Sequence, residues 1–160
     1  MEAIERCEAK ARELEGEIAE RPEAHTDAPT FTSLPRAGRV RAAALLSELG
    51  DVRERFPHPE SLAALAGAAP VTRVSGKHRS VSFRWACDGA LRHAVMDFAG
   101  DSRHASPWAA GIYRRDRGCS HPHAMRILAR AWPRVLWRCR HGRTPYAVAK
   151  NRGAVMPIAA

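Results

Sequence analysis

The chain of 160 residues has no apolar run that approaches the roughly 20 residues of a membrane-spanning helix. Glu2 and Glu5 stand where a secretory signal would need a basic and then an apolar stretch, so we expect no signal peptide. The four cysteines form no CxxC pair and no disulfide-like framework; they are Cys7, Cys87, Cys119 and Cys139. We therefore expect free thiols in a reducing cytoplasm.

The usual pattern of a zinc centre is also missing. Five potential ligands stand near the C-terminus: Cys119, His121, His123, Cys139 and His141. Structural zinc sites commonly draw their ligands from closely spaced pairs such as CxxC or HxxxH, and neither spacing occurs here. We interpret His121 and His123 as the opening of the last helix, with Cys139 in its apolar seam, and predict no metal in this chain.

Acidic residues are scarce outside the first 27 positions. That segment holds nine acids against four bases, a net charge of −5, whereas the whole chain carries +9. The other 133 residues therefore carry +14. Such a body is suited to a polyanion, nucleic acid before all others, and the acidic segment would avoid that partner.

Residues 2–20 have the pattern of an acidic helix. Apolar or small residues alternate at spacings of three and four, while most other positions are charged; they are Ile4, Cys7, Ala11, Leu14 and Ile18. The pattern is compatible with a coiled coil over residues 1–22, which would join a second copy or another protein. A single amphipathic helix lying on its own domain is the alternative. Residues 23–30, with Pro22 just before them, are expected to be a linker.

Residues 31–50 read as a turn followed by a helix that starts near Val40, buries Val40, Ala44, Leu45 and Leu49, and stops at Gly50. The turn resembles the second half of a helix-hairpin-helix, which sets backbone amides and a helix N-terminus against a DNA phosphate. Gly38 and Arg39 would make that contact. The usual pattern has a glycine where this chain has Arg36, so a plain helix-loop-helix hairpin stays open as an alternative.

The rest of the chain predicts further helices over residues 59–67 and 89–104, a shorter one after Ser106, and a long one from about 122 to 140. Alternation at Val81, Phe83 and Trp85 predicts a short strand. Pro133 should kink the last helix. The fold class predicted is mainly α: a helical domain over residues 31–146 with a helix-hairpin-helix-like unit and a short β element, preceded by an acidic coiled-coil helix and followed by a flexible tail, 147–160.

An arginine stripe recurs every four residues along the last predicted helix: Arg126, Arg130, Arg134 and Arg138. A solvated helix face usually mixes charges of both signs, because a ladder of one sign repels itself unless something negative lies along it. We predict that this stripe contacts phosphates.

The stretch from residue 71 to 85 contains no carboxylate, and its Ser75-Gly76 pair lies between clusters of basic residues. It is either a polar turn leading into a strand or a place where the Ser75 hydroxyl meets a phosphate. A serine that attacks a phosphodiester needs its charge neutralised and the backbone close by. Gly76 permits the close approach, and the neutralising residues would be Arg73, Lys77 and Arg79. His78 is the one neighbour that could act as a base.

A series of motifs occurs in a familiar order: 31–38 (FTSLPRAG), 45–51 (LLSELGD), 55–57 (RFP), 62–67 (LAALAG), 69–76 (APVTRVSG), 83–85 (FRW), 91–92 (LR), 107–110 (PWAA), 121–124 (HPHA) and 128–132 (LARAW). This order resembles the C-terminal domain of the IS-116/IS-110/IS-902 family of insertion-sequence transposases over residues 25–146. The acidic helix before it resembles the coiled coil that joins the two domains of that family.

The resemblance implies a bacterial, nucleoid-associated enzyme that cuts and rejoins DNA through a covalent protein–DNA intermediate, with Ser75 as nucleophile. It also implies a ribonuclease-H-like N-terminal domain whose four acids hold Mg²⁺, and in some members a guide RNA. The 160 residues contain no segment like that domain, so Mg²⁺ is expected only with the domain supplied from elsewhere. The spacing between Tyr113 and His121 looks shortened, and Pro133 falls where the family helix is usually unbroken.

We therefore predict a DNA-binding fragment of a transposase or recombinase that is inactive alone. DNA is the expected partner, and a guide RNA is a further one. A non-catalytic nucleic-acid-binding remnant of a truncated transposase is the alternative, and a structural helical bundle with incidental basicity is the third hypothesis.

Overall fold

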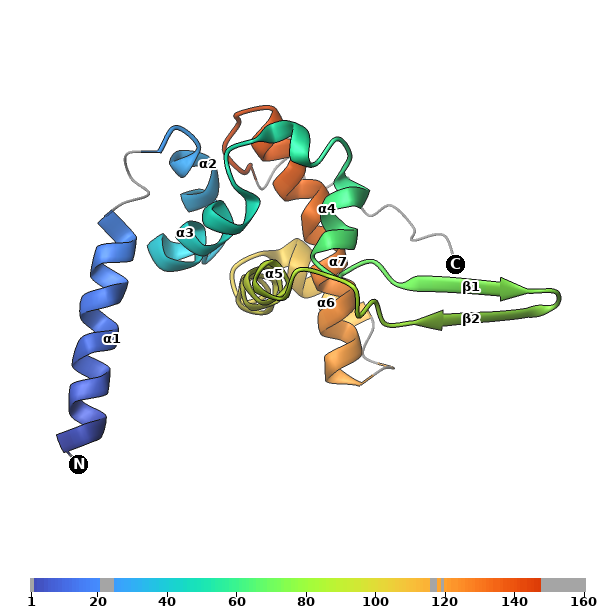
Figure 1. The fold of residues 1–160 in the computed structure, drawn as a ribbon, viewed down its shortest axis with the longest axis horizontal. Coiled ribbons are helices and arrows are strands. Elements are labelled where there is room, and N and C mark those ends of the chain that lie inside the picture. Colours follow the sequence, from blue (N-terminus) through green and yellow to red (C-terminus); the bar gives the residue numbers. More distant parts are fainter. Residues whose placement is uncertain (1, 21–24, 116–117, 119, 148–160) are drawn as a thin grey trace.

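The computed structural model describes residues 2–20, 25–115, 118 and 120–147. Over these residues the chain forms seven α-helices, one short 3-10 helix and one two-stranded sheet (Figure 1). Their bounds are α1 Glu2–Glu20, α2 Ala28–Thr32, α3 Gly38–Leu49, η2 Arg53–Arg55, α4 Pro59–Leu65, β1 Val71–Ser75, β2 His78–Ser82, α5 Gly89–Ser102, α6 Pro107–Arg115 and α7 His121–His141. None of the helices in this part of the chain is long and apolar enough to cross a bilayer. The mainly α prediction with a short β element is confirmed.

The core lies where α3, α4, α5, α6 and α7 meet, and Trp132 of α7 stands at its centre. Its ring contacts those of Phe98 and Trp108 edge to face, with centroids 4.7 and 5.0 Å away. Its indole Nε1 donates a hydrogen bond of 2.9 Å to the hydroxyl of the fully buried Ser102. Because the one polar atom of the indole is satisfied, the large ring can be buried completely.

The predicted helices after residue 50 are found within two residues of their expected ends. Ser106 accepts a hydrogen bond from the Ala109 amide, 3.3 Å, so it caps α6 as its position before Pro107 predicts. Pro133 lies inside α7, which continues through it to His141.

In α3 one expectation was wrong, since Val40 is 40% exposed instead of buried. The helix begins two residues earlier than predicted and turns Leu45, Leu46 and Leu49 towards the core. Val40 lies five positions before Leu45, which is about 140° around an α-helix, so it falls on the outer side.

The predicted strand at residues 81–85 was also placed wrongly. The strands are 71–75 and 78–82, paired antiparallel, and Phe83 and Trp85 lie beyond them. Nearly every residue of the hairpin is exposed on both faces, so no buried face imposed an apolar alternation that the sequence could show.

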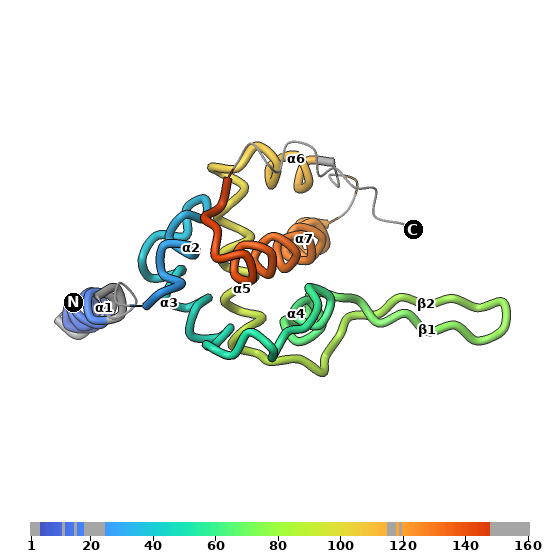
Figure 2. The backbone as a smooth tube through the Cα atoms, turned by 90° about the horizontal axis from the view of Figure 1, so that it is seen from above, coloured from blue at the N-terminus to red at the C-terminus, as the bar shows by residue number. Residues whose placement is uncertain are grey.

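The helix α1 packs against α3 at one end of the molecule and then projects away from the body (Figures 1 and 2). Its apolar residues Ile4 and Leu14 are 66% and 45% exposed. The side chains of Ala11 and Ile18 lie outside the described part. The contact with α3 thus leaves Ile4 and Leu14 exposed, and the partner helix stays a prediction.

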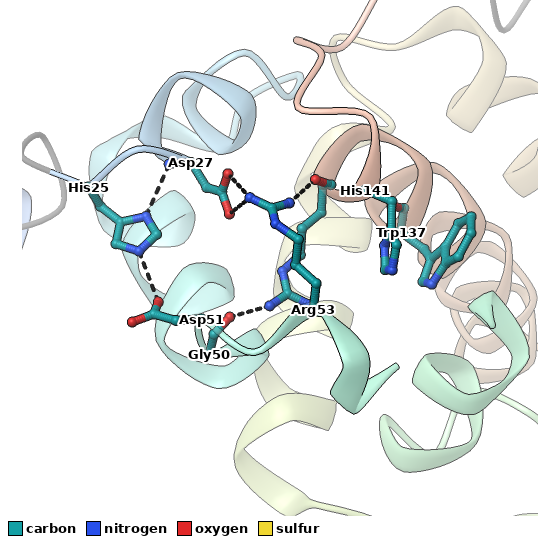
Figure 3. A network of polar contacts seen from close by, with 8 residues as sticks. His25, Asp27, Gly50, Asp51, Arg53, Trp137 and His141 are labelled. Carbon is teal, nitrogen blue, oxygen red and sulfur yellow. Dashed lines mark hydrogen bonds and ion pairs between the residues drawn. The ribbon is translucent and has the colours of Figure 1, made fainter. Parts of the chain in front are cut away.

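A polar network joins the segment after α1 to the end of α7 (Figure 3). One Nη atom of Arg53 lies 2.6 and 2.8 Å from the two carboxylate oxygens of Asp27, and the other donates to the carbonyl of Arg140. The buried Arg140 in turn donates to the carbonyl of Gly50. Since Asp27 is buried too, the folded domain begins before residue 31 and includes part of the expected linker. All of the predicted tail except its first residue, Ala147, lies outside the described residues.

Candidate nucleic-acid interface

Ser75 stands at the tip of the hairpin formed by β1 and β2. The strands are joined by Gly76 and Lys77 alone, and Gly76 has a φ of 57°, as the first central position of a type II′ turn requires. Ser75 is directly opposite His78 in the register. Side chains opposite each other on antiparallel strands have Cβ atoms about 5 Å apart. The fold therefore sets a serine hydroxyl and an imidazole side by side at an exposed tip.

The two faces of the hairpin differ in chemistry. The register places Ser75, His78, Arg73 and Ser80 on one face, because alternate residues of a strand point to the same side. The opposite face carries the exposed Val74 and Val81 with Thr72 and Arg79. Of the three bases expected to neutralise charge beside Ser75, Arg73 shares its face, Lys77 lies in the turn and Arg79 is on the other side.

The basic side chains of the hairpin are exposed: Arg73, Lys77 and Arg79. In the part of the chain that the structure describes, no carboxylate pairs with any of them. The strands project from the body, away from the helices (Figure 1). Their positive charge is therefore available to an anion.

The arginine stripe of α7 is exposed at all four positions: Arg126, Arg130, Arg134 and Arg138. Its first member connects it to the hairpin, since the Arg126 guanidinium lies 5.7 Å from the ring centre of Phe83. A guanidinium nitrogen of Arg134 lies 3.0 Å from the Glu60 carboxylate. The pKa of that carboxyl is lowered, mainly by a hydrogen bond from the backbone amide of Glu60 and next by the hydrogen bond from Arg134. An exposed ion pair of this kind contributes little and would not prevent Arg134 from exchanging its partner for a phosphate.

The turn of the helix-hairpin-helix-like unit, before α3, holds two residues in the left-handed backbone region. Arg36 takes a φ of 57°, the left-handed conformation that favours glycine, where the usual motif has glycine. Gly38 has the same φ and opens α3. Gly38 and Arg39 line a shallow, open depression of about 480 Å³ together with Ala28, Pro29 and Thr32. This unit and the hairpin lie at opposite ends of the domain (Figures 1 and 2), so the structure does not unite them into one site.

Several other arginines hold the fold together instead. Arg41 bonds to Asp97 and Asp101 at 2.6 and 2.9 Å, and Arg36 shares the second of these carboxylates. Burial lowers the pKa of Arg140, whose guanidinium is held in the network described above. Arg140 is not part of the stripe. It follows the buried Trp132 and Leu136 at steps of four residues, so the sequence spacing could have predicted that it is buried.

The family model described as "Transposase IS116/IS110/IS902 family" matches residues 28–114, more than half of the chain. The chain belongs to this family. Similar proteins include the "Mini-circle putative transposase for IS117" of Streptomyces coelicolor. It is 36% identical over 117 residues, or 72% of this chain. The 43.6 kDa protein of insertion element IS110 from the same organism is 37% identical over 79% of this chain. The 42 kDa protein of insertion element IS900 from Mycobacterium paratuberculosis is 31% identical over 86%.

The alignments cover 28%, 32% and 35% of those relatives, so this transposase-family chain spans about a third of their length. The resemblance drawn from the order of the motifs is confirmed.

The carboxylates of this transposase-family chain do not fit a magnesium site at Ser75. Hairpin residues 71–82 contain none, and several of those of the body are engaged: Asp27, Asp97 and Asp101 with arginines, Glu60 with Arg134, Asp51 with His25, and Asp88 as the cap of α5. Among the described residues no three histidine, cysteine or acidic side chains are grouped to hold a metal ion. Of the zinc-type candidates, Cys139 is buried and His121 lies 2.7 Å from the Tyr113 hydroxyl, while Cys119 is outside the described part.

Proposed function

We propose that this chain is the serine-bearing, DNA-binding part of a transposase, and that Ser75 attacks a DNA phosphodiester once a ribonuclease-H-like domain completes the site. The observation that carries the proposal is the hairpin tip, where a serine, a histidine and unpaired bases stand exposed without a carboxylate. Five-residue strands reach about 15 Å. Such a hairpin can enter a site built by another domain while the body stays outside.

In the proposed step, a bond forms between Oγ of Ser75 and the phosphorus as the bond from phosphorus to one deoxyribose oxygen breaks. The serine proton passes to a base, and the departing oxygen takes up a proton. His78 is the group across the register that can accept a proton, and Arg73 on the same face offsets negative charge on the phosphate. Magnesium held by the carboxylates of the other domain would polarise the phosphate and stabilise the developing charge.

The rest of the basic surface would hold the duplex. The stripe runs along α7 from the base of the hairpin, so phosphates bound to it would lead towards the base of the hairpin whose tip carries Ser75. Contacts with phosphates fix the position of a protein on DNA and carry no sequence information of their own. We therefore expect this part of the transposase to bind duplex DNA with little sequence preference.

A complementation assay tests the proposal. With Mg²⁺, the chain alone should bind duplex DNA and neither cleave nor rejoin it. With a ribonuclease-H-like domain from a relative, it should form a DNA adduct that survives denaturation, and Ser75→Ala should abolish the adduct while leaving the affinity within a few-fold, since one hydroxyl contributes at most a hydrogen bond of about 1 kcal/mol. Strong cleavage by the isolated chain would contradict the shared site, and DNA binding without any adduct would favour a non-catalytic remnant.

A further inference from the structure

Trp85 is 82% exposed at the base of the hairpin. The other three tryptophans of the chain are buried or half-buried: Trp108, Trp132 and Trp137. Leaving most of an indole in water forgoes the apolar burial that usually places this residue inside a protein or an interface. A lone exposed apolar residue needs no explanation in general, so the surroundings of this one decide its meaning.

The backbone on both sides of this tryptophan is held in place. Nε of Arg84 donates to the carbonyl of Ala69 at 3.3 Å, and Arg92 donates to the carbonyl of Arg84 at 2.8 Å. Three positions after the indole, the amide of Asp88 donates to the carbonyl of Leu65 at 2.9 Å. The exposed ring is therefore mounted on a fixed segment and is not carried by a free loop.

The Trp85 ring contacts a phenyl ring that two arginine side chains cover. It meets Phe83 at 79° with the ring centres 5.1 Å apart. The same phenyl ring lies under the guanidinium groups of Arg92 and Arg126, 4.6 and 5.7 Å from its centre. A flat aromatic surface thus lies open to solvent within a group of arginines, at the point where the stripe of α7 meets the hairpin.

We propose that Trp85 is a stacking site for an unpaired nucleobase, with the exposed Arg126 of the stripe binding a neighbouring phosphate. Exposed aromatic rings set in a positively charged groove are how proteins bind single-stranded nucleic acid, because every base has a face that can stack. A base inside a duplex already has both faces covered and offers no such contact. An apolar protein partner would have to accommodate the arginine charges, whereas a nucleotide is complementary to both the ring and the charges.

The site rests on the proposed function, because it gives the DNA-binding transposase part a second ligand state, an unpaired strand beside the duplex. The unpaired nucleotide can come from DNA opened near the cleavage point or from an RNA. The two sources share their chemistry and can be distinguished with separate oligonucleotides.

The test measures affinities of the full chain for a blunt duplex, oligo(dT) and oligo(U) at one salt concentration. Trp85→Ala should weaken binding of at least one single strand about 5- to 100-fold, Trp85→Phe much less, and binding of the duplex should stay within about two-fold. The strand affected identifies DNA or RNA as the source. Trp137→Phe is the control. That half-buried indole donates to the Phe56 carbonyl, so its replacement should change none of the three affinities. Quenching of tryptophan fluorescence by the single strand should be lost in Trp85→Phe.

Equal binding of both single strands by wild type and Trp85→Ala, with the duplex still bound, would overturn the stacking site and leave the proposed function intact. An equal loss for duplex and single strand would overturn it too, as would a changed oligomeric state with unchanged affinities, which would indicate a protein partner. Failure of the wild type to bind any nucleic acid would instead refute the proposed function. The side chain is exposed, so circular dichroism should show that the variants fold.

Discussion

Replacing Arg130 and Arg138 by glutamine should flatten the salt dependence of duplex binding. These two members of the stripe are exposed and make no ion pair among the described residues, whereas Arg126 lies over Phe83 and Arg134 pairs with Glu60. The double variant therefore removes two cations without breaking a contact that the fold uses. Its free energy of unfolding should change little.

The size of the effect follows from counterion release. Each neutralised phosphate contributes about 0.9 to the slope of log K against log salt concentration, so two lost contacts should reduce the slope by about two. Between about 50 and 200 mM salt the wild type should then lose about ten-fold more affinity than the variant.

Fluorescence anisotropy with a labelled blunt duplex over a salt series measures both slopes. The matched control is Lys10→Gln with Arg12→Gln, which removes the same charge from α1, where both residues face glutamates. An unchanged slope in the stripe variant would show that the stripe faces solvent or a protein. Equal flattening in the control would show that net charge, and no particular contact, sets the slope.

Asp27→Asn should lower the free energy of unfolding in urea by about 2 kcal/mol, because a charge-assisted contact with a partly buried guanidinium is lost; no change would mean that this pair adds nothing to stability. Gly38→Ala should cost about 1 kcal/mol because of its φ of 57°, and Gly111→Ala, in open space within α6, should not destabilise; a neutral Gly38→Ala would refute the left-handed turn. Leu14→Asp should shift sedimentation towards monomer, unless the wild type is already monomeric at high concentration. His78→Gln should slow adduct formation about 100-fold with unchanged duplex affinity, and an unaffected rate would exclude it as the base.

Most helices were predictable because each has a buried side that imposes a period on its sequence. In α7 the buried Leu128, Trp132 and Leu136 alternate with exposed arginines, and the predicted ends agree with the structure within two residues. The predicted burial of Val40 was wrong because one apolar residue on a helix of alanines and leucines does not define which side is buried.

The hairpin was predicted only in part because its strands bury neither face. What defines it is the turn at Gly76 and the pairing of residues 71–75 with 78–82, and neither depends on apolar alternation. Trp85 was mistaken for a strand residue for the same reason. The candidate site was predictable from its own residues as far as Ser75, Gly76 and the basic cluster. The acids that would hold magnesium in the proposed site could not be predicted, because residues 71–85 contain no carboxylate.

The identity of the DNA-linked residue decides whether Ser75 is the nucleophile. Trypsin cuts after Arg73, Lys77, Arg79 and Arg84, so it isolates Ser75 in the peptide 74–77 and places Ser80 and Ser82 together in 80–84. The adduct formed in the complemented reaction should be digested and the peptide on the DNA identified by its mass. We predict that DNA is attached to residues 74–77. Attachment to 80–84, whose Ser80 and Ser82 lie on the same face of the hairpin as Ser75, would show that Ser75 is not the nucleophile.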